Sequence, residues 1–294
     1  MIVQDTRKGV MMMVATTVIF ALQDGISRHL AGTYNVYLVV MVRYWFFALF
    51  VLALAARAPG GVRTAARTAH PWLQAMRGLL LVAEIYVMII AFVRIGLINA
   101  HSVFICYPLI VAALSGPVLG EKVGWRRWTA IGVGLVGVLI ILSPTGGVFS
   151  TDALIPLLAA GMFAVYALAT RYVARDDSGA VSFFWTGIAG VVASSAVGLW
   201  FWQPMSAGDW AWMALLCVMG VAGHWLMIKA YEIAEASTLQ PIAYLQLVWG
   251  AAMGMLVFGD VLRSNVVLGA TLTVGAGLFT IWRERQKARA ARQG

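Results

Sequence analysis

Long apolar stretches constrain the fold of this chain more than any other feature. A helix that crosses a bilayer needs about 20 mostly apolar residues, and ten stretches of the 294-residue sequence come close to that length. Hydrophobic residues make up 62% of the chain and charged residues 11%, whereas soluble domains have about 25% charged residues. The predicted spans are 9–30, 36–56, 73–95, 99–119, 126–143, 153–173, 180–201, 210–231, 236–258 and 265–282. The sequence therefore predicts an all-α membrane protein with ten transmembrane helices.

Positive charge is divided unevenly between the two sides of the predicted spans. If the N-terminus is placed inside, fifteen of the 21 Lys and Arg residues fall on the cytoplasmic side, three fall on the other side and three lie within helices. Cytoplasmic loops of membrane proteins carry an excess of Lys and Arg. We therefore predict that both termini are cytoplasmic. Membrane orientation also explains the net charge of +9 better than binding to nucleic acid does.

The second half of the chain repeats the first. The segment Gly120-Glu121-Lys122 recurs 139 residues later as Gly259-Asp260-Val261, in each case between a proline-bearing helix and a glycine-rich one. Phe20 and Arg28 likewise match Phe163 and Arg171 at an offset of 143 residues. Each half holds five predicted helices.

The repeat predicts three parts of the chain. These are a first five-helix repeat over 1–145, a second over 146–283, and a basic cytoplasmic tail over 284–294. Because five is an odd number, the second copy enters the membrane from the opposite side. Inverted repeats of this kind are typical of secondary transporters, which bind their substrate near the bilayer midplane between the halves.

Two five-helix halves, each with an acidic turn (Gly120-Glu121 and Gly259-Asp260) before its last helix, resemble the drug/metabolite transporter superfamily, EamA type. Within it the chain is most similar to YddG-type amino-acid exporters of bacterial inner membranes. The resemblance implies a central cavity lined by predicted helices 1, 3, 4, 6, 8 and 9. It also implies alternating-access export of small metabolites, above all amino acids including aromatic ones, without a cofactor. Asp260 stands where the family usually has Glu, which conserves the charge.

Several other functions remain open or are disfavoured. The same architecture also serves export of drugs or other organic cations, and a receptor or channel is a weaker alternative because the polar residues are isolated. The chain has no HExxH zinc motif and no GxSxG nucleophile elbow, so we expect neither an enzyme nor a metal site. Cys106 and Cys217 lie in hydrophobic runs, which indicates small core residues. We expect a monomer whose partners are the substrate and the lipid bilayer.

Two ionisable residues lie near the centres of predicted spans. Glu84 is about halfway along 73–95, and His224 is near the middle of 210–231. Charged groups in a membrane are costly and usually functional. The 139-residue offset places Glu84 opposite Gly223, next to His224. We interpret Glu84 and His224 as substrate-binding residues for a zwitterion or for proton handling; the alternative is a structural hydrogen-bonded pair.

Asp24 and Arg43 fall at similar depths on adjacent, antiparallel predicted spans. The spacing predicts an intramembrane ion pair that neutralises both residues, with a structural or gating role. Direct contact with substrate is the alternative interpretation.

Five aromatic residues lie deep on helices that the resemblance assigns to the cavity, and they form a predicted apolar, polarizable pocket. They are Phe104, Tyr107, Phe163, Tyr166 and Tyr244. Ordinary packing in the membrane core is the alternative for each. Pro108 and Pro241 would leave the carbonyl groups of Phe104 and Ser237 without their helical donors, where a ligand ammonium could be accepted.

Overall fold

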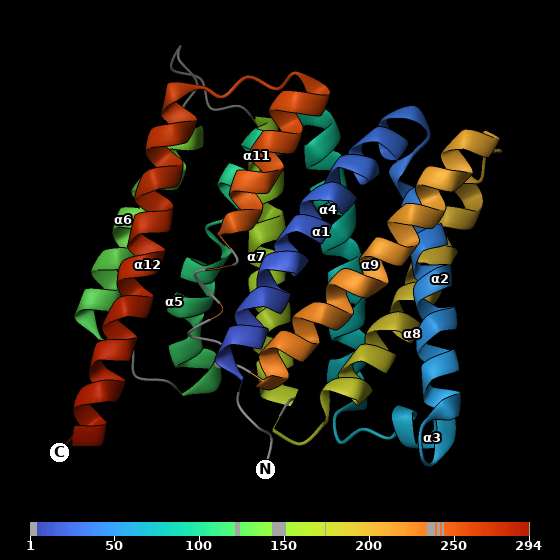
Figure 1. The fold of residues 1–294 in the computed structure, drawn as a ribbon, viewed down its shortest axis with the longest axis horizontal. Helices are drawn as coiled ribbons and strands as arrows, with labels where there is room; N and C mark the ends of the chain where they lie inside the picture. Colours follow the sequence, from blue (N-terminus) through green and yellow to red (C-terminus); the bar gives the residue numbers. More distant parts are fainter. Residues whose placement is uncertain are drawn as a thin grey trace.

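The protein, described by a computed structural model, is a bundle of long helices that run between two ends (Figure 1). The structure describes residues 5–120, 124–142, 151–173, 175–233, 239, 242 and 244–293. Every regular element among these residues is helical. The elements are α1 (Thr6–Thr33), α2 (Val36–Arg57), α3 (Gly61–Ala66), α4 (Pro71–Phe104), α5 (Tyr107–Leu119), α6 (Trp125–Leu142), the 3-10 turn Thr151–Ala153, α7 (Leu154–Val173), α8 (Gly179–Gly198), the 3-10 turn Leu199–Phe201, α9 (Ala207–Ile233), α11 (Leu245–Phe258) and α12 (Ser264–Gln293).

Six of the described helices are long and apolar enough to cross a membrane. They lie in α1, α2, α4, α7, α8 and α9. Four shorter apolar helices, of 10–17 residues, lie in α5, α6, α11 and α12. The helical membrane fold is thus confirmed, whereas the count of ten spans stays a prediction.

The predicted boundary between spans 73–95 and 99–119 falls at a break between two helical segments of α4, whereas span 99–119 is itself divided at residues 105–106. α4 runs from Pro71 to Phe104 and passes through Gly96, the one residue inside it with non-helical angles (φ 82°, ψ 167°). Glycine adopts a positive φ without a Cβ clash, so the chain kinks there and resumes the helix. The helix ends at Phe104, and α5 starts with Pro108 in its first turn, where the missing N–H is not needed. Pro241 and Ser237 lie outside the described residues.

The acidic turns of the repeat follow helices that end in the same way. α5 ends at Leu119 and α11 at Phe258, and the glycines that follow them, Gly120 and Gly259, have φ values of 76° and 68°. A left-handed residue at this position lets its N–H satisfy carbonyl groups of the last turn. Both glycines were part of the repeat found in the sequence, and the structure gives them equivalent roles.

The helices pack in a few extensive pairs. α1 lies against α9 and α11, α4 against α7 and α8, and α2 against α8. α6 and α12 pair at one edge of the bundle (Figure 1). A Cβ atom on Gly137 of α6 would lie 2.6 Å from the carbonyl oxygen of Gly269 of α12. Small residues therefore bring these two helices into backbone contact, as is common between membrane helices.

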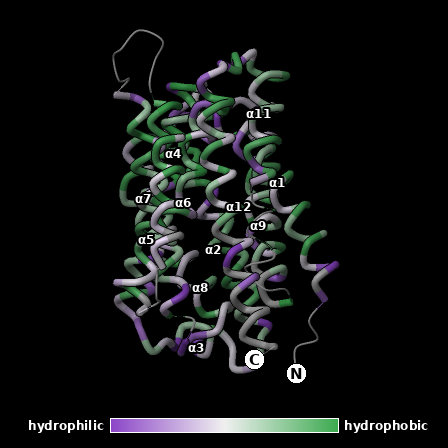
Figure 2. Tube along the Cα trace, turned by 90° about the vertical axis from the view of Figure 1, so that its left-hand side faces the viewer, coloured by the Kyte–Doolittle hydropathy of each residue, from purple (hydrophilic) through white to green (hydrophobic). Residues whose placement is uncertain are grey.

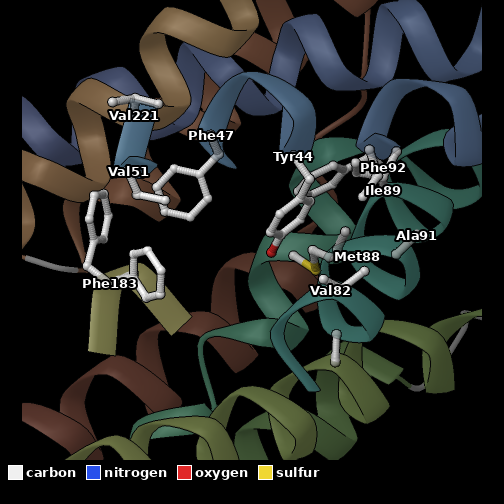
Figure 3. Close-up of a cluster of buried hydrophobic side chains, with 14 of the residues drawn as sticks. Tyr44, Phe47, Val51, Val82, Met88, Ile89, Ala91, Phe92, Phe183 and Val221 are labelled. Carbon is white, nitrogen blue, oxygen red and sulfur yellow. The ribbon is translucent and has the colours of Figure 1, made fainter. Parts of the chain in front are cut away.

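Apolar side chains cover the outside of the bundle as well as its core. Between its two ends the bundle consists mostly of hydrophobic residues (Figure 2). Some of them lie on the outside: Leu256, for example, is 84% exposed. A surface of this kind suits contact with lipid. Inside, Phe47 of α2 meets Phe183 of α8 edge-on, with 4.7 Å between the ring centroids (Figure 3). Cys106 and Cys217 are buried free thiols, which confirms their prediction as core residues.

Candidate functional site

Asp24 of α1 is the centre of a polar contact between three helices. Its Oδ2 atom accepts a hydrogen bond of 3.2 Å from Nε2 of Gln246 in α11 and lies 3.3 Å from Nε2 of His101 in α4. The second contact has the distance of an ion pair without the alignment of a hydrogen bond, because His101 Nε2 makes none. His101 is 4% exposed and is held by Phe92, 5.0 Å away between ring centroids, and by Gly250, where a Cβ would lie 2.7 Å from the imidazole.

The predicted direct ion pair between Asp24 and Arg43 is not formed among the residues that the structure describes. The Arg43 guanidinium lies 3.5 Å from Ser27 Oγ, about one turn further along α1, and borders Gly220 of α9. The Asp24 carboxylate turns instead toward α4 and α11. The two charges still interact over a longer range. Similar depth in the membrane does not ensure that two side chains face each other.

Glu84 of α4 is buried, with 5% of its surface exposed. Within the described part of the chain, no hydrogen bond to its carboxyl group is formed. It does interact electrostatically with Asp24 and Arg43. Glu84 therefore faces the interior of the bundle, and its role in binding stays a prediction.

His224 of α9 lies among aromatic rings. Phe20 and Phe47 meet it edge-on, with centroids 5.1 Å and 6.3 Å away. Its Nδ1 atom is buried and has no hydrogen-bond partner in the described structure. No hydrogen bond or ion pair joins His224 to Glu84 among the described residues, so the two do not form the hydrogen-bonded pair that the sequence left open.

Four of the five predicted aromatic residues form a continuous row. Phe104 lies 5.3 Å from Tyr107 and 5.6 Å from Phe163, measured between ring centroids. Tyr107 meets Phe163 at 4.8 Å, and Phe163 lies 5.7 Å from Tyr166. The guanidinium of Arg77 stacks 5.0 Å above the Tyr166 ring. The row joins α4, α5 and α7, and presents rings on which a flat ligand could stack.

A small cavity lies where α4 gives way to α5, opposite the start of α11. Its volume is about 30 Å³, and its lining residues are His101, Phe104, Ile105, Tyr107, Pro108, Tyr244, Gln246 and Leu247. Tyr244, the fifth predicted aromatic residue, has a buried hydroxyl without a hydrogen-bond partner among the described residues. The cavity thus brings together three predicted residues and lies one contact away from Asp24.

Sequence reasoning missed His101 and Gln246. His101 was one of four scattered histidines, and Gln246 is a single uncharged polar residue in an apolar run. The available signal was a polar side chain within each of the predicted spans 99–119 and 236–258. That signal does not reveal that both residues reach the same carboxylate.

A second polar contact, the Asp260 latch, lies where α1 and α11 end. Both carboxylate oxygens of Asp260 accept from Nη1 of Arg28 at 2.9 Å, and Oδ2 also accepts from the Leu97 amide at 2.9 Å. Leu97 follows Gly96, where α4 kinks. Asp260 therefore caps the second segment of α4 from another part of the chain, while Arg28 stacks 4.3 Å above Phe258.

Asp177 organises the opposite side of the bundle, between α7 and α8. Its carboxylate accepts hydrogen bonds from the Thr68 hydroxyl, from the Ala69 amide at 3.0 Å and from Gln74 Nε2 at 2.8 Å. Burial alone would raise the pKa of Asp177, but the hydrogen bonds from Thr68, Gln74 and Ala69 outweigh it and lower the pKa.

The lowered pKa of Asp177 predicts acid sensitivity. Its stabilisation is present above the unfolded pKa of about 3.9 and is lost as pH falls through the lower folded value. Asp177→Asn should therefore lower the melting temperature at neutral pH, and the gap to the wild type should close as the pH falls through that range. The control is Asp176→Asn, which removes an exposed contact with His70 and should change the melting temperature less. Equal losses for both variants would contradict the role of Asp177.

Comparison with known proteins identifies this arrangement of helices. The EamA-like transporter family matches residues 7–143 and again residues 151–282, which together make up most of the chain. The chain belongs to the EamA-like transporter family. It is therefore a membrane transporter, and the family expected from the repeat and its acidic turns is confirmed.

Relatives of this EamA-like transporter include proteins named after two different substrates. An S-adenosylmethionine uptake transporter of Rickettsia prowazekii is 25% identical over 95% of this chain and 94% of its own. A riboflavin transporter of Vibrio cholerae is 27% identical over 97% of this chain and 96% of its own, and one of Brucella anthropi is 27% identical over 90% and 96%.

A solved crystal structure shares the fold. It has a TM-score of 0.61 and 18% sequence identity, and the match covers 96% of this EamA-like transporter and 98% of the other chain. At that identity the likeness concerns the fold alone. The expected closer similarity to YddG-type amino-acid exporters is not supported, because the named relatives are S-adenosylmethionine uptake and riboflavin transporters.

Proposed function

We propose that the chain is a secondary transporter that carries a small metabolite across the bacterial inner membrane by alternating access. The observation that carries the proposal is the contact of Asp24 with His101 and Gln246. Asp24 and His101 belong to the first family match, and Gln246 belongs to the second. A buried polar cluster between membrane helices is costly and marks a substrate or ion pathway by default.

The small cavity beside this cluster is the closed form of the proposed substrate site. Its volume of about 30 Å³ is enough for only a few water molecules. A metabolite can therefore enter only after α11 moves away from the α4–α5 junction. Such a movement would also separate Gln246 from Asp24. Opening of the substrate site would therefore break this hydrogen bond.

Two inverted halves with ten spans, and both termini in the cytoplasm, are part of the proposal. The pairing of helices supports it. If α7 and α9 correspond to α1 and the first part of α4, the packing of α1 on α9 has its counterpart in that of α7 on α4. Likewise, the packing of α1 on α11 has its counterpart in the packing of α7 on α5. The pairs α2–α8 and α6–α12 each join equivalent helices of the two halves, so exchanging the halves leaves these pairs unchanged. Each half could then adopt the other's conformation, which is how inverted repeats give alternating access.

We propose a substrate that combines a flat ring with a positive or zwitterionic group. S-adenosylmethionine and riboflavin, after which the relatives are named, both contain flat ring systems, and S-adenosylmethionine also contains an amino-acid group and a sulfonium cation. The aromatic row supports the first feature, and the Asp24 and Glu84 carboxylates support the second. Aromatic amino acids and organic cations share these features and remain candidates. Export, the direction that the sequence favoured, and uptake are both compatible with a carrier that responds to gradients.

Flux into liposomes tests the proposal. Purified protein is expected to speed the equilibration of at least one member of a panel over empty liposomes, without ATP. The panel contains S-adenosylmethionine, riboflavin, aromatic amino acids and quaternary ammonium compounds. Asp24→Asn should reduce the flux, whereas Asp152→Asn, at an exposed pair with Arg94, should not. Absence of flux for the whole panel, with folded protein, would contradict transport by this site.

A further inference from the structure

Two carboxyl groups and one guanidinium interact with one another in the centre of the bundle. Asp24 and Glu84 contribute two carboxyl groups, and Arg43 is the one guanidinium with which both interact among the described residues. Asp24 has further partners in Gln246 and His101. Glu84 has no hydrogen-bond donor among the described residues, although it is buried.

Among the described residues, no Lys or Arg side chain of the surrounding helices forms an ion pair with Glu84. α8 and α11 have no ionisable side chain, and α6 and α12 carry theirs only near their ends. α2 adds Tyr44, α7 adds Tyr166, and α9 adds Cys217 and His224. The remaining nearby cations have their own contacts: Arg28 binds Asp260, Arg77 binds Ser182 and Thr186, and Lys229 lies over Trp225.

An ionised Glu84 would therefore be a buried anion without a hydrogen bond. Such a group is stable only when it takes up a proton or meets a cation. Asp24 differs, because its carboxylate accepts from Gln246 and lies beside His101. Of the two carboxyl groups, Glu84 is the one without a hydrogen-bond donor among the described residues, and it shares its interaction with Arg43 with Asp24.

We propose that Glu84 carries a proton when the substrate site is empty and exchanges it for the positively charged group of the substrate. This inference rests on the proposed function and adds its coupling. When the cation enters beside Asp24 and Glu84, the O–H bond of Glu84 breaks and its proton passes to water on the side to which the site is open. When the cation leaves, the carboxylate takes a proton back from the solution that it then faces. One proton moves against one positive charge, so the exchange is electroneutral.

Liposomes with a pH gradient test the exchange. The probe is S-adenosylmethionine, which has a net positive charge at neutral pH, and riboflavin is the uncharged comparison. With the inside one pH unit more acidic, one-for-one exchange should drive S-adenosylmethionine to an internal excess of about tenfold. A pH-sensitive dye should report proton efflux during its entry, and clamping the membrane potential should not change the excess. Riboflavin should cause no proton movement.

Variants assign the exchange to Glu84. Glu84→Gln should abolish both the internal excess and the proton efflux, whereas Asp152→Asn, a carboxylate outside the cluster, should retain them. Glu84→Asp keeps a titratable group and should retain proton efflux even if Glu84→Gln does not fold. Full coupling in a folded Glu84→Gln protein would overturn the assignment.

The outcomes for the wild type separate coupling from transport. Flux of S-adenosylmethionine without accumulation or proton movement would overturn the exchange and leave the proposed transport intact. Flux of riboflavin alone would overturn the inferred cation site in the same way. Absence of flux for every compound of the panel would overturn the proposed function itself.

Discussion

Asp260→Ala is expected to lower the free energy of unfolding by about 2–3 kcal/mol, because it removes hydrogen bonds between charged or helix-terminal groups that are largely shielded from water. The side chains of Arg28 and Asp260 are 17% and 13% exposed. Removal of the carboxylate therefore leaves the guanidinium largely buried and without its counter-charge. It also leaves the Leu97 amide, at the kink of α4, without its acceptor. Thermal unfolding in detergent measures the loss. Hydrogen exchange should show that the Leu97 amide becomes less protected.

Two further variants separate the parts of the Asp260 latch. Asp260→Asn keeps an oxygen that can accept from Leu97 and removes the charge opposite Arg28, so its loss should be smaller than that of Asp260→Ala. The control is Arg94→Gln, which breaks an exposed pair with Asp152 (59% and 43% exposed) and should cost about 0–1 kcal/mol. A cost for Arg94→Gln equal to that for Asp260→Ala would show that the latch adds nothing beyond a surface ion pair.

The latch also illustrates what the sequence could and could not predict. The repeat singled out Gly259-Asp260 and matched Arg28 to Arg171, so two of the three residues of the latch were found and Leu97 was not. Their contact was not, because Arg28 and Asp260 are 232 residues apart. A repeat shows which residues of the two halves are equivalent. It does not show which residues of one half contact residues of the other half.

Hydropathy located the apolar helices well, but it found only one of the two interruptions between residues 73 and 119. The division between spans 73–95 and 99–119 contained Gly96, where the structure separates two helical segments of α4. A glycine between two apolar runs fits a loop or a kink equally well, because both need a residue with a permissive backbone. The missed break, at residues 105–106, comes just before Pro108, which the sequence analysis had placed inside the continuous span 99–119.

The aromatic row was predicted from the positions of its residues on expected cavity helices, and four of them do lie in contact. The polar part of the site was predicted less well. Counting residues along a helix gives the depth of Asp24, Arg43 and Glu84 in the membrane, but the direction of each side chain depends on how the helix is rotated by its neighbours. For this reason depth suggested Arg43 as the partner of Asp24, and packing selected His101 and Gln246 instead.

Double-mutant cycles are expected to show that Asp24 interacts more strongly with His101 than with Arg43. Removing one member of a buried charged contact can cost about 3–5 kcal/mol, because the other member is left unpaired in a medium of low polarity. Asp24→Asn and His101→Gln remove the same 3.3 Å contact, so their combined cost should fall short of the sum by about 1 kcal/mol or more. Asp24→Asn and Arg43→Gln act on groups whose nearest polar contacts differ, and their effects should be closer to additive. Reversible unfolding in mixed micelles gives all five variants and the wild type on one scale. A larger interaction energy for Asp24 with Arg43 than with His101 would show that the pair expected from depth forms in the membrane, and that α1 is rotated relative to the arrangement described above.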